Sequence, residues 1–299
     1  MAITVHPVTP QFAAEVGDVD LGQPIAADDI AAIKAAFTKY AVLVFPDQTF
    51  SDESHLDFAR HFGPLETSVF AIRQDHKMRL DAQMADVGNL DADNNILKTD
   101  DRIRLYQLGN RLWHTDSSFK RLPAYCSILH GRSIPPIGGH TEFADLRAAY
   151  DALPESTKRK IAGLVAEHSL LTSRSRLGFS DFDETERKAF EPVPQVLVRR
   201  LQDSGRMSLY LASHAGAIRG MARPEAEKLL KELIDHATQR QFVYTHRWRV
   251  NDLVMWDDRC TMHRGMAFDD QRFKRDMRRA TVCDVAPTCE QMGLAVAAE

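Results

Sequence analysis

The chain has 299 residues, of which 44% are apolar and 27% are charged, a balance typical of a soluble globular protein. The net charge of −4 argues against an extensive nucleic-acid-binding surface, and no apolar run approaches the ~20 residues that cross a bilayer. We therefore expect neither nucleic acid nor a membrane among the partners of this protein.

The N-terminus and the cysteines both bear on the compartment. The first residues do not show the basic region followed by an apolar stretch that marks a secretory signal. No two cysteines have C-x-x-C spacing, which favours reduced structural thiols; they are Cys126, Cys260, Cys283 and Cys289. Together these features predict a cytoplasmic protein.

The first part of the chain alternates extended segments with helices. Residues 3–21 are expected to form short extended segments, and the apolar residues of 28–40 form one helical stripe. Residues 41–45 are an apolar run closed by a proline, which is typical of a buried strand. Ser51 can cap a further helix, 51–62.

Residues 67–112 differ from the rest of the chain. They are polar, rich in Asp, Asn and Arg, and show no sustained periodicity. A segment of this length without clear elements is more typical of a lid or a mobile loop than of a packed core. Because it lies directly before His114, we expect it to cover a functional site.

Beyond residue 112, strands and helices are mixed. Helices are predicted at 145–153, 154–164 and 223–238, and strands at 193–201, 209–212, 242–250, 253–256 and 279–285. Many short strands with inserted helices predict a mainly β fold, in which helices flank a double-stranded β-helix (jelly-roll) core. We expect one domain over residues 1–299.

Three residues have the side chains of an iron site. His114 and Asp116 are two positions apart, which places both side chains on one face if the segment is extended. His263, much further along the chain, follows a buried strand and a polar turn. Two imidazoles and one carboxylate can hold Fe(II) on one triangular face and leave the other face open for a cosubstrate and O₂. The sequence therefore predicts an iron site if the fold brings the three together.

A basic cluster follows His263. A guanidinium can hold a carboxylate through two parallel hydrogen bonds, and Arg275 and Arg279 are candidates for this role. A 2-oxo acid with two carboxylates would need such an anchor at the end remote from the metal. The alternative is that the cluster is simply a solvated surface.

Four segments, in this order, resemble the Fe(II)/2-oxoglutarate dioxygenases of the taurine dioxygenase superfamily: 112–119, 138–153, 256–265 and 278–281. Within that superfamily the chain is most similar to the 2,4-dichlorophenoxyacetate dioxygenases. The resemblance covers nearly the whole chain and is weakest in 67–112 and in the last dozen residues.

The resemblance implies roles for particular residues. His114, Asp116 and His263 would bind the iron. Thr141 and Arg275 would hold the far carboxylate of 2-oxoglutarate.

Arg279 and His214 would lie at the substrate, and a structural histidine is the alternative for His214. The spacing from His263 to Arg275 is one position longer than the family pattern, so Lys274 remains an alternative to Arg275.

The implied activity is an Fe(II)- and 2-oxoglutarate-dependent hydroxylation of a small carboxylic acid. An aryloxyacetate such as 2,4-dichlorophenoxyacetate would be cleaved to a phenol and glyoxylate, with release of succinate and CO₂. A sulfonate, an alkyl sulfate or another small organic acid is the alternative substrate, because some substrate-side residues of the phenoxyacetate enzymes are replaced; the replacements are Leu201, Ala71 or Ile72, and Asn95.

Other classes of protein remain open from the metal residues alone. Two imidazoles and a carboxylate also suit Zn²⁺, so a zinc hydrolase is one alternative and a non-catalytic metal sensor is another. The resemblance also implies a homo-oligomer that acts on a small anionic molecule.

Overall fold

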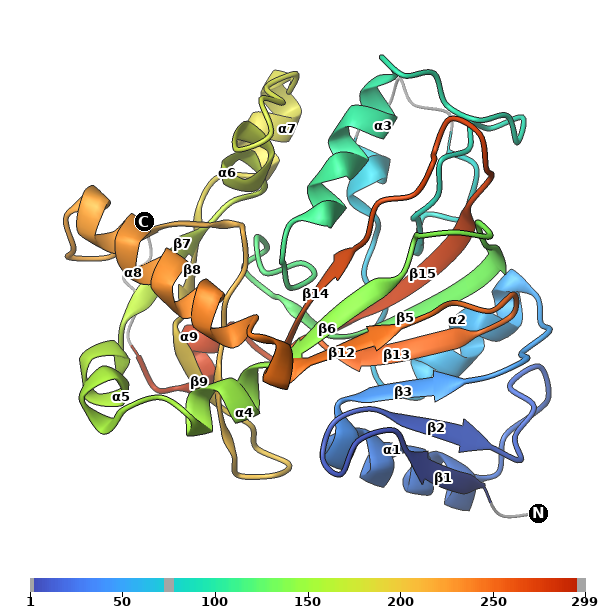
Figure 1. Cartoon of the computed structure of the whole chain (residues 1–299), viewed down its shortest axis with the longest axis horizontal. Coiled ribbons are helices and arrows are strands. Elements are labelled where there is room, and N and C mark those ends of the chain that lie inside the picture. The colour runs from blue at the N-terminus through green and yellow to red at the C-terminus, as the bar shows by residue number, and fades with distance from the viewer. Residues whose placement is uncertain (1–2, 73–77, 295–299) are drawn as a thin grey trace.

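The computed structural model describes residues 3–72 and 78–294 (Figure 1). The strands are β1 (Thr4–Pro7), β2 (Ala14–Gly17), β3 (Val42–Phe45), β4 (Met84–Asp86), β5 (Ala124–Ser133), β6 (Thr141–Asp145), β7 (Val165–His168), β8 (Val193–Val196), β9 (Val198–Arg200), β10 (Met207–Leu209), β11 (Ala215–Ile218), β12 (Val243–His246), β13 (Leu253–Asp257), β14 (Thr261–Gly265) and β15 (Asp276–Cys283). The α-helices are α1 (Ala27–Tyr40), α2 (Asp52–Arg60), α3 (Arg102–Gln107), α4 (Leu146–Asp151), α5 (Glu155–Ile161), α6 (Leu170–Ser175), α7 (Glu184–Ala189), α8 (Arg223–Ala237) and α9 (Thr288–Gln291), and the 3-10 helices are η1 (Val69–Ile72), η2 (Leu108–Arg111) and η3 (Arg240–Phe242). The prediction of many strands with inserted helices is confirmed.

The largest sheet in the described part of the chain has the strand order β1-β2-β3-β13-β5-β15-β4. Its neighbouring strands are antiparallel except for β2 and β3, which are parallel. Side chains alternate between the two faces, so Leu43, Met255 and Ile128 lie side by side on one face while Val44 and Trp256 lie on the other. Both faces are therefore buried at the centre of the sheet.

Helices α1 and α2 cover one face of this sheet (Figure 1). Both were predicted, and the Ser51 side chain caps α2 by accepting a hydrogen bond from the Ser54 backbone N–H at 3.2 Å. Helix α1 ends at Tyr40 and is followed by its C-cap residue Ala41, which has a left-handed φ of 58°. Because Ala41 caps the helix, the strand predicted at 41–45 begins one residue later, at Val42.

The opposite face packs against a second sheet, with the order β12-β6-β14. Phe143 of β6 contacts Trp256 of the large sheet, with ring centroids 5.4 Å apart. His263 of β14 lies against the same indole ring, with centroids 4.7 Å apart. The interface between the two sheets thus carries one of the predicted metal ligands.

The remaining strands and helices form a separate hydrophobic cluster around α8 and α4. The helices predicted at 145–153, 154–164 and 223–238 are confirmed as α4, α5 and α8, with α4 and α5 shorter than expected. The prediction of a single strand at 193–201 is wrong. It is divided at Leu197 into β8, which pairs with β7, and β9, which pairs with β10. The strand predicted at 209–212 lies earlier, as β10.

The segment 67–112, described except for 73–77, was expected to lack regular elements, and this expectation is wrong. Strand β4 pairs with the edge strand β15, and Tyr106 of α3 packs in an aromatic cluster with Phe179 and Phe182. These elements have only three and six residues. Elements this short show too little periodicity to be recognised from the sequence.

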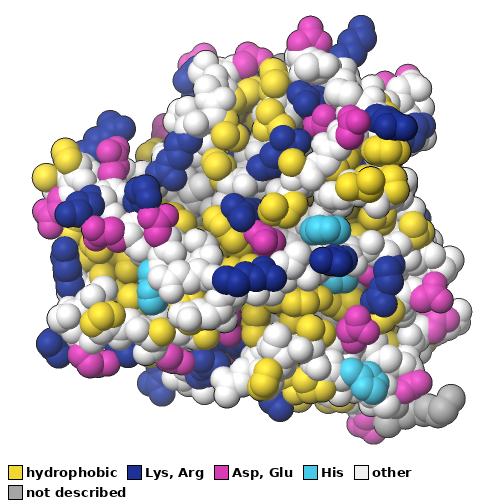
Figure 2. All heavy atoms as spheres, viewed as in Figure 1, with side chains coloured by type: hydrophobic (Ala, Val, Ile, Leu, Met, Phe, Trp, Pro, Cys, Tyr) yellow, Lys and Arg dark blue, Asp and Glu magenta, His cyan; other side chains and the backbone are white. Residues whose placement is uncertain are grey.

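No helix in the described ranges has both the length and the apolar character of a membrane-spanning segment. On the face drawn in Figure 2, acidic and basic side chains are interspersed with apolar ones.

The buried pair His55 and His130 makes folding stability depend on pH. The His55 Nε2 donates to the Ile128 carbonyl at 3.0 Å, and burial lowers the pKa of His55 to about 3 and that of His130 to about 4. Below pH ~6.5 the unfolded chain takes up protons that the folded chain does not, so the free energy of unfolding falls as pH drops toward 4, by about 1.4 kcal/mol per pH unit for each histidine. Chemical denaturation at several pH values measures this slope.

The substitution His55→Gln removes one of the buried histidines that take up a proton on unfolding. We therefore expect the slope of unfolding free energy against pH to fall by about one proton. The same change at the exposed His6 serves as the control and should leave the slope as it is. An unchanged slope in the His55 variant would contradict this account.

Candidate active site

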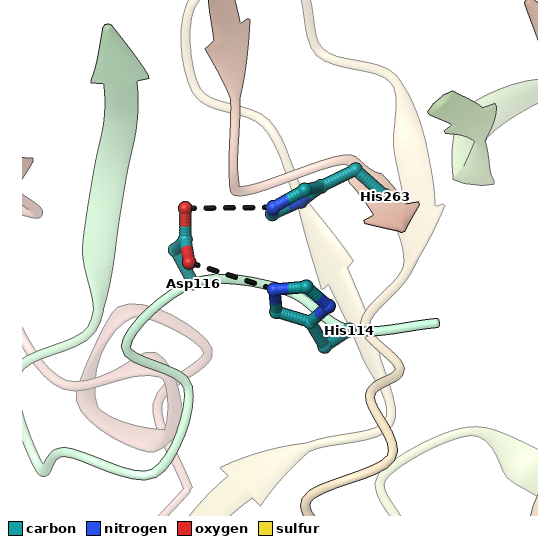
Figure 3. A group of neighbouring side chains, drawn as sticks. All are labelled: His114, Asp116 and His263. Atoms are coloured by element: carbon teal, nitrogen blue, oxygen red, sulfur yellow. Dashed lines mark ion pairs between the residues drawn. The ribbon is translucent and has the colours of Figure 1, made fainter. Parts of the chain in front are cut away.

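A backbone bridge brings His114 and His263 together. The His114 N–H donates to the His263 carbonyl at 3.0 Å, and the His263 N–H donates to the His114 carbonyl at 2.8 Å. The two rings consequently lie side by side, with centroids 4.2 Å apart. Figure 3 shows that both rings turn an Nε2 atom toward the Asp116 carboxylate, at 3.8 Å for His114 and 3.7 Å for His263.

The predicted cluster of three side chains is therefore assembled by the fold, and one ligand atom from each lies within 4.8 Å of the others. The segment is not extended throughout, because Asp116 lies in a turn. The Thr115 hydroxyl anchors this segment, with hydrogen bonds to the Leu211 and Thr261 carbonyls at 2.8 and 2.9 Å.

The two imidazoles are neutral. Burial lowers the pKa of His114, and burial together with the neighbouring His114 ring holds the pKa of His263 well below its usual value. The Nδ1 of His114 donates to the Leu112 carbonyl at 2.7 Å, so the Nε2 of this ring carries a lone pair.

The Asp116 carboxylate is ionised. Burial alone would raise its pKa, but the Arg279 guanidinium beside it holds the pKa below its usual value. Arg279 donates to Oδ1 at 2.6 Å and the Ser127 hydroxyl to Oδ2 at 2.8 Å, which fixes the orientation of the carboxylate.

The three side chains direct acceptor atoms at one another, and these atoms repel one another. A divalent cation between them would remove this repulsion. A carboxylate and two neutral imidazoles form a donor set suited to Fe(II), so the residues present fit the predicted metal.

One cavity beside the cluster is lined by Thr141, His263, Phe268 and Arg275, and we call it the Arg275 cavity. It encloses about 810 Å³ of empty space, its open mouth included. Arg275 donates from Nη1 to the Val87 carbonyl at 2.8 Å, while its Nε has no hydrogen-bond partner and the guanidinium forms no ion pair among the described residues. Burial lowers the pKa of Arg275 to about 10. The cavity thus presents a cation with free donors near the metal residues.

The rival residue, Lys274, points elsewhere. Its ammonium donates to the Asn94 carbonyl at 2.6 Å in an exposed position, and it does not line the Arg275 cavity. The geometry favours Arg275 as the group that meets a ligand in that cavity.

A second cavity is lined by Tyr106, Phe119, Arg174 and His214, and we call it the Arg174 cavity. It encloses about 690 Å³ of empty space, its open mouth included. The two cavities share a few residues, so the metal cluster lies where they meet; the shared residues are Val87, Gln107, Asn110, His114 and Arg279.

The structure places His214 beside the metal cluster. Its ring lies 6.1 Å from that of His114, and its Nδ1 shares a hydrogen bond of 2.9 Å with the Ser173 hydroxyl. A role in substrate binding remains a prediction for His214 and for Arg279.

Sequence reasoning missed Arg174. The only signal was its position four residues after Leu170, which places both on one face of α6, and both are buried. Of the positions that depart from the phenoxyacetate enzymes, Leu201 is buried against Phe12 and the other residues of the sheet interface, and neither Leu201 nor Asn95 lines either cavity.

Comparison with known proteins gives three consistent similarities. The model of the family described as taurine catabolism dioxygenase TauD, TfdA family matches residues 4–281. The alpha-ketoglutarate-dependent 2,4-dichlorophenoxyacetate dioxygenase of Cupriavidus pinatubonensis is 43% identical over 286 residues, which cover 96% of this chain and 99% of that protein. The (S)-phenoxypropionate/alpha-ketoglutarate-dioxygenase of Sphingobium herbicidovorans is 37% identical over 276 residues, 90% of this chain and 91% of that protein.

Among solved structures, AAD-2 in complex with Mn(II) and N-oxalylglycine superposes with a TM-score of 0.88 at 46% identity. The match covers 96% of this chain and 99% of AAD-2.

Substitution of His263 by alanine tests the metal cluster directly. We expect the affinity for Fe(II), or for Mn(II) as a redox-stable probe, to fall more than about 100-fold, because one of three ligands is lost. Anaerobic titration calorimetry measures this affinity without turnover. His6→Ala is the control, and a His263→Ala variant that binds the metal as the wild type does would refute the assignment.

Proposed function

The chain belongs to the taurine catabolism dioxygenase TauD, TfdA family, and from that membership we propose that it is the Fe(II)- and 2-oxoglutarate-dependent dioxygenase of an aryloxyacetate, such as 2,4-dichlorophenoxyacetate. The observation that supports this most is the pair of cavities that meet at the metal cluster. A dioxygenase of this class must bind two organic acids beside one metal, and each cavity contains an arginine that forms no ion pair within the described ranges.

His114, Asp116 and His263 would hold the iron. When bound, iron and 2-oxoglutarate supply the oxidising chemistry, which consumes O₂, releases succinate and CO₂, and converts one C–H bond of the substrate to C–OH. The chain contributes geometry and charge, since Arg279 and Ser127 keep the Asp116 carboxylate ionised and oriented.

Arg275 and Thr141 would hold the far carboxylate of 2-oxoglutarate. Both line the Arg275 cavity together with His263. The Thr141 hydroxyl oxygen accepts from the Trp248 indole N–H at 2.9 Å, which leaves its own proton free to be donated to a carboxylate.

The substrate would occupy the Arg174 cavity, which His214 and Arg279 also line. Hydroxylation of the carbon beside the ether oxygen gives a hemiacetal. The bond between the hemiacetal carbon and the ether oxygen then breaks, and the oxygen stays on the aryl ring. The hydroxyl group loses its proton, the aryl oxygen gains one, and the products are a phenol and glyoxylate. The relatives named for phenoxyacetate and phenoxypropionate support this substrate class.

The two facing sheets support a jelly-roll core, which we propose extends through one domain of residues 1–299. Gln107 and Asn110 line both cavities, which supports a lid role for the segment 67–112. We also propose a homo-oligomer in the cytoplasm; the free thiols support the compartment, and exposed Ile137 and Val285 offer apolar contacts.

A substrate panel tests the activity. With Fe(II), 2-oxoglutarate and O₂, we expect 2,4-dichlorophenoxyacetate to yield 2,4-dichlorophenol, glyoxylate and succinate in equal amounts. Its kcat/KM should exceed that of taurine or an alkyl sulfate by at least about tenfold, the size of one altered pocket contact. Preference for a sulfonate or a sulfate would overturn the substrate proposal, and absence of succinate with every acid would overturn the function itself.

The variant Arg275→Met tests the cosubstrate anchor. Loss of a charged hydrogen-bonding partner should raise the KM for 2-oxoglutarate by about 10- to 100-fold and leave the KM for the aryloxyacetate within about twofold. Lys274→Met is the matched control and should change neither constant. If the lysine variant shows the larger effect instead, Lys274 is the anchor.

A further inference from the structure

Arg174 differs from the other buried arginines of the described chain. Three of the four most buried ones have a carboxylate partner: Arg147 with Asp145 at 2.9 Å, Arg199 with Asp284 at 2.7 Å and Arg259 with Asp257 at 2.7 Å. Arg174 is 4% exposed and forms no ion pair with any described carboxylate. Its Nη1 donates to the Ser173 hydroxyl at 3.2 Å, and its Nε has no hydrogen-bond partner.

A buried charge without a counter-ion is unfavourable, and a fold usually avoids it by pairing. Burial accordingly lowers the pKa of Arg174. The guanidinium is held by the Tyr106 ring, whose centroid lies 4.5 Å from Cζ, which stabilises the cation without neutralising it. The charge of Arg174 is thus available to an anion that enters the cavity.

The carboxylates that line the same cavity are already paired. Glu66 forms an ion pair with Lys120 at 2.6 Å, and Asp86 with Arg79 at 2.7 Å. Asp116 forms an ion pair with Arg279 at 2.6 Å.

Arg279, the arginine expected to meet the substrate acid, is therefore engaged by a metal ligand. Among the described residues that line this cavity, Arg174 is the arginine that remains for the substrate.

The backbone of η2 lies directly against the Arg174 guanidinium and limits where it can lie. A Cβ added at Gly109 of η2 would lie 2.0 Å from Nη1 and 2.2 Å from Cζ of Arg174. Only glycine lets the backbone approach the guanidinium this closely. Gly109 thus offers a way to displace the cation without removing it.

We propose that Arg174 binds the carboxylate of the organic acid that serves as the substrate. This contact makes the enzyme select an anionic substrate over a neutral analogue of the same shape. The inference rests on the proposed function and deepens it. The planar fork of the guanidinium suits two parallel hydrogen bonds to a carboxylate. Tyr106 and Phe119 line the same cavity and offer aromatic contacts to the aryl group.

The test compares two substrates that differ only in charge, 2,4-dichlorophenoxyacetate and its neutral primary amide, at saturating 2-oxoglutarate. Arg174→Met should raise the KM for the acid by about 10- to 100-fold, the range for a lost charged hydrogen bond, and leave the KM for the amide and for 2-oxoglutarate within about twofold. Arg174→Lys should retain part of the preference for the acid over the amide, because lysine keeps the positive charge but lacks the planar guanidinium. Arg223→Met, an exposed site on α8, is the control for loss of one arginine.

The variant Gly109→Ala keeps the charge and displaces the guanidinium, so the KM for the acid should rise while the KM for the amide stays constant. If Arg174→Met does not fold, this variant and Arg174→Lys still test whether Arg174 binds the substrate carboxylate. The inference is overturned if the acid-to-amide preference of these variants equals that of the wild type. It is equally overturned if the KM values for acid, amide and 2-oxoglutarate rise together, since that pattern reports a structural role.

Failure of the proposed function is a separate outcome. If the wild type oxidises only a sulfonate or a sulfate, the aryloxyacetate proposal fails, and the same variants compared on that anion and an uncharged analogue still decide the role of Arg174.

Discussion

The candidate site depends on the two backbone hydrogen bonds that join His114 to His263. They place two distant parts of the chain directly opposite each other, and β14 is itself held by β6, so the separation of the two rings is set by the sheet. The anchored Thr115 then leads the chain into the turn that carries Asp116. Because backbone geometry positions all three side chains, the donor atoms converge without any need for a flexible loop to close around the metal.

The two cavities beside the metal cluster each contain one arginine that is left out of the local ion pairs. Most buried cations are neutralised locally, and Asp116 is held by Arg279, which lies where the two cavities meet. Among the described residues, the exceptions that line these cavities are Arg275 in one and Arg174 in the other, each with an Nε that has no partner. Two organic acids could thus bind beside the metal cluster, each next to its own arginine. Under the roles proposed above, separate anchors would allow the cosubstrate and the substrate to be recognised independently.

The sequence predicted long, periodic elements well and short ones poorly. Helices α1 and α8 show an apolar stripe over three or more turns, and both were recognised almost to the residue. Strands β8 and β9 were merged, because an apolar run does not reveal that its two halves pair with different partners. Elements β4 and α3 are held by β15 and by the aromatic cluster, which are contacts with remote parts of the chain.

For the site, residue type and spacing alone indicated which side chains could hold a metal and which arginines could meet a carboxylate. Only the tertiary structure decided that the three metal candidates meet and that Arg275 rather than Lys274 faces a cavity. It also decided that the overlooked Arg174 has no counter-ion in the part of the chain that the structure describes. The physical reason is that an arginine is chemically the same wherever it stands in the sequence. Whether it is solvated, neutralised or kept for a ligand depends on which acids the fold brings within reach.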